Sequence, residues 1–310
     1  MHPPALQPEL IAESQVAPSQ AVIVVTGATG FVGRALAAAL EALDVPHELL
    51  DRRRSKAGLE GALAALPASQ RQRAVLIHLA GLSDARLAER EPSQALDDIV
   101  RLTLHTVEAC VRFKLAKCVL VSTALVYGRQ PCQPVAEEAM LRPQGLYAGA
   151  KAAAESIALG RAAGEAIALD IVRPCNVIGP GIKAGTLVAD VLAQLRRRPS
   201  RVRLQSLHVR RDYLDVRDLA QALLAVARLP ASPGQVRVFN AGTGIGTSAL
   251  ELCRLLQRIA GLPSTDPIET GAEDLRAFDL IPDPGRLRAM TGWAPIWSLE
   301  ETLIEVAHGA

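Results

Sequence analysis

The chain has 310 residues, of which 49% are hydrophobic and only 3% aromatic, so we expect a large core built mainly from Ala, Leu and Val. A formal net charge of +2 gives no indication of binding to nucleic acid or to an anionic membrane. Five scattered cysteines without a metal-ligand spacing predict reduced thiols and no metal site.

The first twenty residues contain three prolines by Pro8 and lack the basic start and apolar run of a signal peptide. We expect residues 1–20 to be disordered or loosely packed. No apolar run reaches the roughly 18–20 residues that a transmembrane helix requires. The sequence therefore predicts a soluble, cytoplasmic protein.

The first predicted element is a buried strand over residues 21–25, followed by a glycine-rich turn and a helix over about residues 34–43. Three glycines fit a phosphate-binding turn. Gly27 permits the tight turn, Gly30 lets backbone N–H groups approach a pyrophosphate, and Gly33 lets the helix lie close to the sheet. This pattern predicts a dinucleotide-binding site.

A second strand is predicted over residues 47–51, and it ends at Asp51. An acid about twenty residues after the glycines is placed to bind the adenosine ribose hydroxyls. Arg52 begins a run of three arginines that would either meet a 2′-phosphate or form a solvated loop. The choice between NAD and NADP therefore stays open.

Further strands are predicted over residues 74–81, 118–123 and 167–173, alternating with helices over residues 93–114 and 144–160. His78, on an apolar strand, is interpreted as a core histidine rather than a catalyst. The alternation predicts an α/β fold with a doubly wound parallel sheet, the Rossmann arrangement. Thr123 then lies at the carboxyl edge of the sheet, where such folds bind ligands.

Tyr147 and Lys151 are four residues apart, so on a helix they share one face. A neighbouring ammonium is expected to lower the pKa of a phenol from its ordinary value of about 10. With a Ser or Thr hydroxyl nearby, such a pair suits hydride chemistry at a C–OH or C=O centre, provided that a hydride carrier is bound. Without a carrier, the two residues would be an exposed helix pair.

After Pro174 the pattern loosens. Helices are predicted over residues 186–198, 215–228 and 247–260, with an extended piece over 236–240 and two short helices in the last 28 residues. We expect residues 21–175 to form a dinucleotide-binding domain and residues 176–310 to be mainly a substrate lobe, from which residues 215–245 return to the sheet.

With these residues in view, the chain resembles the extended short-chain dehydrogenase/reductase family, which contains nucleotide-sugar epimerases, dehydratases and reductases. The resemblance extends from Val22 to about Leu303. It rests on eight stretches taken in order, at residues 26–33, 78–81, 122–128, 147–151, 173–181, 211–216, 239–243 and 292–295.

The resemblance implies that Tyr147 is the acid/base, that Lys151 lowers its pKa and holds the nicotinamide ribose, and that the Thr123 hydroxyl assists at the reacting oxygen. Asn176 and Arg211 fall where the family contacts the substrate diphosphate, although Arg211 can also be read as a surface charge. Expected cofactor-binding residues are Gly27, Thr29, Gly30, Phe31, Val32, Gly33, Asp51, Arg52, Leu79, Ala80, Gly81, Ser122, Tyr147, Lys151 and Pro174. Expected substrate-binding residues are Thr123, Asn176 and Arg211.

One departure from the family pattern excludes a reaction. Ala124 and Leu125 stand where similar 4,6-dehydratases carry the Asp-Glu pair that water elimination requires. In addition, Ile99 and Leu102 replace an Asn and a Gly that relatives often carry before the fourth strand.

A ketoreductase and a 4-epimerase then remain, and the site residues do not separate them. Residues 176–183 and 211–216 are most similar to reductases of GDP-4-keto-6-deoxymannose. We therefore expect reduction of a nucleotide 4-keto-6-deoxyhexose, with a 4-epimerase that holds NAD tightly as the alternative and a non-catalytic NAD(P)-binding regulator as the second.

The resemblance also suggests a homodimer formed by the helix before the fourth strand and the Tyr147 helix. The Ala-rich run at residues 148–154 permits close approach of a second copy, or else it packs on the chain's own core.

Overall fold

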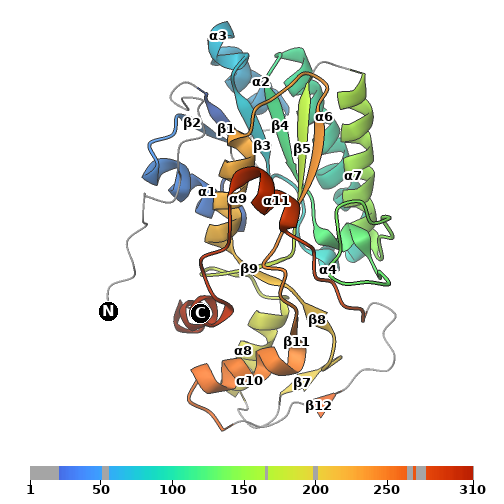
Figure 1. Cartoon of the computed structure of the whole chain (residues 1–310), viewed down its shortest axis with the longest axis vertical. Helices are drawn as coiled ribbons and strands as arrows, with labels where there is room; N and C mark the ends of the chain where they lie inside the picture. The colour runs from blue at the N-terminus through green and yellow to red at the C-terminus, as the bar shows by residue number, and fades with distance from the viewer. Residues whose placement is uncertain are drawn as a thin grey trace.

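In a computed structural model, the described residues are 21–50, 56–164, 167–197, 202–263, 268–269 and 277–309. The main sheet has six parallel strands in the order β10-β5-β4-β3-β1-β2 (Figure 1). They are β1 (Ile23–Thr26), β2 (His47–Leu50), β3 (Val75–His78), β4 (Lys117–Val121), β5 (Ala168–Pro174) and β10 (Val236–Ala241). The predicted Rossmann-type α/β fold is confirmed.

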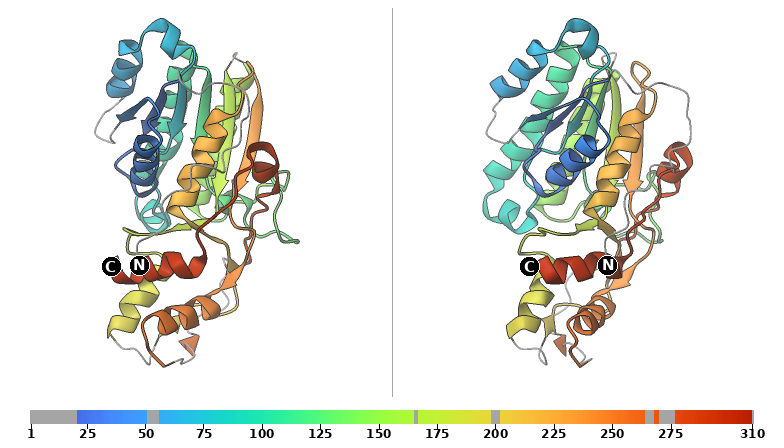
Figure 2. Two further views of the ribbon diagram at one scale, coloured as in Figure 1. Left: turned by 60° about the vertical axis from the view of Figure 1, so that its left-hand side comes forward. Right: turned by 90° about the vertical axis from the view of Figure 1, so that its left-hand side faces the viewer.

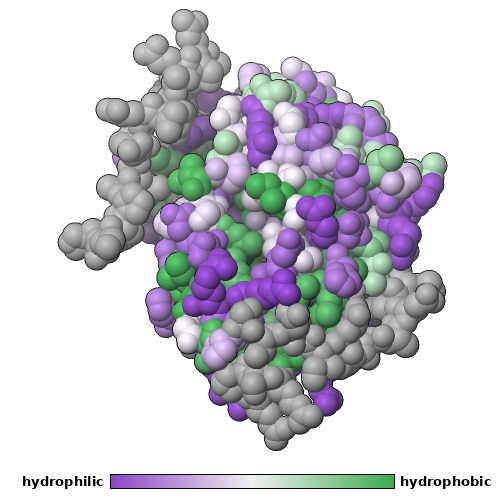
Figure 3. All heavy atoms as spheres, turned by 60° about the horizontal axis from the view of Figure 1, so that its bottom comes forward, coloured by the Kyte–Doolittle hydropathy of each residue, from purple (hydrophilic) through white to green (hydrophobic). Residues whose placement is uncertain are grey.

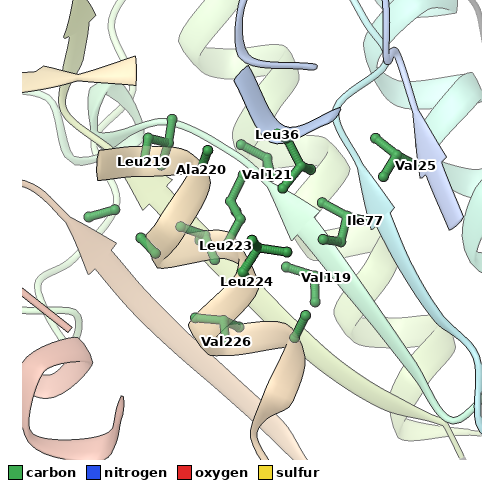
Figure 4. Packing of buried hydrophobic residues seen from close by; sticks show 14 of the residues in the cluster. Val25, Leu36, Ile77, Val119, Val121, Leu219, Ala220, Leu223, Leu224 and Val226 are labelled. Carbon is green, nitrogen blue, oxygen red and sulfur yellow. The ribbon is translucent and has the colours of Figure 1, made fainter. Parts of the chain in front are cut away.

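Helices cover both faces of this sheet. On one face lie α1 (Phe31–Ala42) and α9 (Val216–Arg228), with α11 (Gly285–Thr291) beside β10; on the other lie α2 (Lys56–Ala65), α6 (Leu102–Arg112) and α7 (Leu146–Ala163). Figure 4 shows Leu223 and Leu224 of α9 beside Val119 and Val121 of β4. Because side chains alternate along a strand, β4 contributes Val119 to this core and Leu120 to the core on the opposite face. The short helix α3 (Ala68–Arg71) leads into β3.

A smaller unit, here called the C-terminal lobe, lies below the sheet in Figures 1 and 2. Its core lies among α8 (Leu187–Arg197), α10 (Ala249–Ile259) and α12 (Leu299–Gly309). Its short strands pair as β6 (Asn176–Ile178) with β9 (Tyr213–Asp215), β7 (Arg203–Leu204) with β12 (Ile268–Glu269), and β8 (Arg210–Arg211) with β11 (Thr247–Ser248). The chain enters this lobe directly after β5 and again after β10, so the lobe lies at the carboxyl edge of the sheet.

The chain leaves the lobe at α9 and returns to the sheet. Asp215 caps this helix by accepting a hydrogen bond from Arg217 N at 2.8 Å. The Asp218 carboxylate, in the first turn of the helix, accepts hydrogen bonds from Ile296 N and Trp297 N, each at 3.1 Å. Within the Gly-Trp-Ala-Pro stretch at residues 292–295, Trp293 Nε1 donates to the Asp218 carbonyl oxygen at 3.0 Å. Residues 293–297, which precede α12, are therefore held against α9.

Several predicted boundaries are wrong. The helix predicted over residues 93–114 is three pieces, α5 (Pro92–Leu96), a π-helical turn η2 (Asp97–Arg101) and α6, and a further short helix, α4 (Ala85–Arg90), precedes them. Hydrophobic spacing does not distinguish a single π turn from an α-helix, because the extra residue shifts the pattern only locally. The first helix begins at Phe31 rather than at residue 34, since Gly30 already serves as its N-cap.

Within the described ranges, no helix is both long and apolar enough to cross a membrane. Figure 3 shows the described part of the lower face, where hydrophilic and hydrophobic residues are interspersed.

Candidate active site

The glycine turn connects β1 to α1 with close backbone contacts. Gly27 has φ +77°, and a Cβ there would lie 2.7 Å from Ala80 N. A Cβ on Gly33 would collide with the Gly27 carbonyl oxygen and would lie 2.7 Å from the Ala28 Cα. Gly30, the N-cap, provides no side-chain cap for α1. The first N–H groups of this helix are thereby left for an anionic group, as in dinucleotide sites.

The end of β3 lies against this turn. Ala80 N donates a hydrogen bond of 3.4 Å to Thr26 Oγ1, and a Cβ on Gly81 would lie 2.9 Å from the Asp98 carbonyl oxygen. The predicted cofactor residues Leu79 and Ala80 thus lie next to Gly27, and Gly81 lies next to η2.

His78 belongs to the core, as predicted. It is 2% exposed, and its Nδ1 lies 2.8 Å from Thr26 Oγ1. Burial, with a contribution from the Lys151 charge, lowers the pKa of His78 to about 3, so the imidazole is neutral at neutral pH.

The end of β4 brings the predicted hydroxyls next to α7. Thr123 is the N-cap of the short helix η3 (Ala124–Tyr127) and accepts a hydrogen bond from Leu125 N at 3.2 Å. Lys151 Nζ donates to the carbonyl oxygen of Val121, the last residue of β4, at 3.0 Å. Within the described chain, the buried Ser122 Oγ makes no hydrogen bond, so a polar group of a ligand can satisfy it.

Tyr147 lies in the first turn of α7 and packs against the cluster that contains Leu82 and Ala150. Burial raises the pKa of Tyr147 to about 12. The predicted lowering is therefore wrong, because desolvation of the phenolate dominates. Burial likewise lowers the pKa of Lys151 to about 8, and the Glu155 carboxylate opposes this shift.

The predicted substrate residues lie on adjoining strands at the lobe. Asn176 Nδ2 donates to the Asp212 carbonyl oxygen at 3.1 Å, and β6 pairs with β9, which begins two residues after Arg211. The Arg211 guanidinium lies 4.8 Å from the centre of the Phe278 ring, and burial lowers its pKa. Pro174, at the end of β5, leads into β6. The predicted Asp51 and Arg52 lie outside the described residues.

Sequence reasoning missed a buried polar network behind these residues. Arg173 pairs with Glu155 at 2.6 Å and donates to Tyr127 Oη at 2.9 Å. The Tyr127 hydroxyl donates to Asn240 Oδ1 at 2.7 Å. One signal was available, because Glu155 follows Lys151 by four residues and so shares its helix face.

The residues present fit a nicotinamide dinucleotide. The uncapped N-terminus of α1 can hold its pyrophosphate, and the unsatisfied hydroxyl of Ser122 lies beside Lys151 and Thr123 at the carboxyl edge of the sheet.

The sequence matches the NAD dependent epimerase/dehydratase family over residues 23–242. The chain belongs to this family. It is 31% identical over 296 residues to the GDP-6-deoxy-D-mannose reductase of Pseudomonas aeruginosa, covering 91% of this chain and 94% of the relative. It is 29% identical to the UDP-glucose 4-epimerase of Azospirillum brasilense, covering 88% of this chain and 87% of the relative.

Among solved structures, the fold is similar to that of the RMD protein from Pseudomonas aeruginosa complexed with NADPH. The TM-score is 0.81 and the identity 27%, with 93% of this chain and 98% of that chain covered. The chain is thus an enzyme of the family, and its cofactor is NAD or NADP.

Changing Gly33→Ala should weaken NAD(P)H binding by more than about tenfold and lower the free energy of unfolding by about 1–3 kcal/mol, because the new methyl forces α1 away from the turn. Cofactor titration and urea unfolding measure the two effects. Gly61→Ala is the matched control, since a Cβ on this helical glycine would meet nothing within 4 Å. It should stabilise the protein slightly and leave binding unchanged. Equal cofactor affinity in both variants would contradict the assignment of the turn.

Proposed function

We propose that this chain reduces the keto group of a nucleotide 4-keto-6-deoxyhexose, with Tyr147 as the proton donor. The observation that carries the proposal is the similarity to GDP-6-deoxy-D-mannose reductase over nearly the whole of both chains. The closeness of Lys151 to the end of β4, next to Ser122 and Thr123, supports it.

In this proposal NAD(P)H, when bound, supplies the hydride. The phenol of Tyr147 then gives its proton to the alkoxide oxygen of the sugar. A phenol whose pKa burial raises to about 12 holds its proton at neutral pH, and an alkoxide is a strong enough base to remove it. The Thr123 hydroxyl orients the same oxygen, and the Lys151 ammonium stabilises the phenolate as it forms.

Asn176 and Arg211 are proposed to bind the diphosphate of the substrate. The guanidinium of Arg211 stacks on the Phe278 ring. Because the ring is rigid, this contact fixes the orientation of the guanidinium and of its N–H donors. Two N–H groups of one guanidinium can donate to two oxygens of a phosphate at once, so this arrangement supports diphosphate recognition.

Changing Arg211→Gln should therefore raise the KM for the nucleotide sugar about 10- to 100-fold with little change in kcat, since hydrogen bonds to charged groups contribute about 1.5–3 kcal/mol. Steady-state kinetics with varied sugar concentration measure this. Arg210→Gln is the control, because Arg210 is already engaged with the Gly246 carbonyl oxygen at 2.9 Å. A KM that rises equally in both variants would count against a diphosphate contact at Arg211.

A 4-epimerase is the second candidate, and the similarity to the Azospirillum brasilense enzyme over 88% of this chain supports it. The same three residues serve both reactions, since an epimerase removes and returns a hydride at one carbon. The difference lies in the cofactor, which a reductase must release after each turnover. A non-catalytic regulator is not carried forward, because these nearly full-length relatives are named as enzymes.

One experiment separates the two candidates. The masses of the purified protein from native and denaturing mass spectrometry are compared to detect a bound cofactor. The protein is then mixed with NADPH or NADH and a keto-sugar generated by a dehydratase. The proposal predicts an empty protein and loss of reduced cofactor in proportion to sugar. A retained NAD with no consumption of added NADPH or NADH would favour the epimerase.

The homodimer and the cytoplasmic location stay predictions. Ala148, Ala150 and Ala154 are each no more than 2% exposed, packed within the chain itself. These three alanines therefore pack inside one copy, whereas Gly149 and Ala153 of the same run are only partly buried.

A further inference from the structure

Glu155 is a buried carboxylate on the helix that carries Tyr147 and Lys151. It is 0% exposed. The three residues are spaced by four along α7, so they lie on one face of the helix. Burying a charge without a partner is costly, and here the partner is provided by the sheet.

That partner is Arg173 on β5, which donates two hydrogen bonds to the carboxylate. Arg173 Nε donates to Glu155 Oε1 at 3.1 Å and Nη2 donates to Oε2 at 2.6 Å. This bidentate ion pair fixes both the distance between α7 and β5 and the orientation of α7 on β5.

The third guanidinium nitrogen extends the contact to the segment that begins at Thr123. Arg173 Nη1 donates to Tyr127 Oη at 2.9 Å and to the Glu137 carbonyl oxygen at 3.2 Å. Tyr127 is the last residue of η3, and Thr123 is its N-cap. One buried ion pair thus connects the two segments that carry the proposed active-site side chains.

We propose that Glu155 is a positioning residue with two roles. Its ion pair with Arg173 fixes α7 against β5, and its buried carboxylate lies on the same helix face as the Lys151 ammonium and stabilises the charge of that ammonium. This inference rests on the proposed function only in treating Lys151 as an active-site residue.

The charges around Lys151 support this role. Burial lowers the pKa of Lys151 to about 8, and Glu155 is the neighbour that raises it. His78 on β3 faces the same ammonium and is kept neutral by burial. The other acidic, basic and histidine side chains on the helices and the strand packed against α7 are Arg86, Glu89 and Arg90 on α4, Asp97, Asp98 and Arg101 on η2, His105, Glu108 and Arg112 on α6, and Asp170 and Arg173 on β5.

The test measures the charge of Lys151 directly in the cofactor-free protein. The chain has five lysines, Lys56, Lys114, Lys117, Lys151 and Lys183, so selective ¹³C labelling of lysine gives few signals, and Lys151→Arg identifies one of them by its loss. The ε-carbon shift is then followed against pH in the parent protein and in Glu155→Gln, which keeps the shape of the side chain and removes its charge.

The titration midpoint of Lys151 should fall by about one pH unit in Glu155→Gln, because the variant removes an opposite charge close to the ammonium of Lys151. The alkaline limit of the pH–rate profile should shift by the same amount. Glu137→Gln is the matched control. Its side chain is only 5% exposed and its Oε1 accepts a hydrogen bond from Asn240 N within the same network, but it lies off α7. It should lower the thermal midpoint without moving the Lys151 titration.

A merely structural role gives a different result. If Glu155→Gln lowers the thermal midpoint while the Lys151 titration stays where it was, the inference is wrong. Should that variant not fold, Glu155→Gln combined with Arg173→Gln removes both charges of the pair, and the Lys151 midpoint must still fall for the inference to stand. Since the titration needs no turnover, its outcome is independent of whether the proposed reduction is observed.

Discussion

Changing Tyr147→Phe should lower kcat for keto-sugar reduction by about 10²- to 10⁴-fold, the usual contribution of a positioned acid. The phenylalanine ring keeps the packing against Leu82 and Ala150, so NAD(P)H affinity and the thermal midpoint should change little. Stopped-flow measurement of reduced-cofactor oxidation at saturating sugar checks the rate.

Tyr213→Phe is the control for this experiment. Tyr213 is a buried tyrosine, and burial raises its pKa to about 12, as it does for Tyr147, but Tyr213 lies on β9 and outside α7. Its replacement should leave kcat within a few-fold of the parent. Equal losses in the two variants would mean that Tyr147 has no special role in proton transfer.

The largest effect on stability is expected at Asp170, which joins two cations inside the protein. Its carboxylate accepts hydrogen bonds from Arg237 at 2.6 and 2.7 Å and pairs with Lys117 Nζ at 3.3 Å. Lys117 is 1% exposed and also donates to the carbonyl oxygens of Val226 and Leu229 near the end of α9. Changing Asp170→Asn leaves the buried Lys117 and the partly buried Arg237 without their counter-charge and should cost about 3–5 kcal/mol in the free energy of unfolding.

Urea unfolding of Asp170→Asn measures this cost, with Asp190→Asn as the control. Asp190 also pairs with an arginine, Arg86, at 3.0 Å, but its side chain is 39% exposed. A solvent-exposed ion pair contributes about 1 kcal/mol or less. If the two variants were destabilised equally, the contacts among Asp170, Lys117 and Arg237 would not stabilise the packing of α9 on the sheet.

The sequence was most informative where geometry follows from local residue type. The β-branched run at residues 22–25 and the three glycines predicted β1 and its turn, because few other residues tolerate the φ of Gly27 or the close contact at Gly33. Helical spacing likewise placed Tyr147 and Lys151 on one face.

Features that depend on contacts between distant segments were not predictable. The Arg173–Glu155–Tyr127 network joins β5, α7 and η3. The spacing of these residues in the sequence does not predict the contacts, because they form only when the three elements pack together. The π turn at Asp97–Arg101 was missed because one extra residue leaves the hydrophobic pattern helical. The pKa of Tyr147 was predicted in the wrong direction, because burial is a property of the folded chain.

The central claim is hydride transfer to the sugar carbonyl with a proton from Tyr147. The most direct measurement uses NADPH deuterated at the transferable position of the nicotinamide, with the keto-sugar product analysed by mass spectrometry and NMR. The account predicts one deuterium per product molecule, bonded to the former carbonyl carbon. With Tyr147→Phe the amount of product should fall as kcat falls, while each product molecule still carries one deuterium. A product sugar that carries no deuterium, although the parent protein converts the substrate, would contradict it.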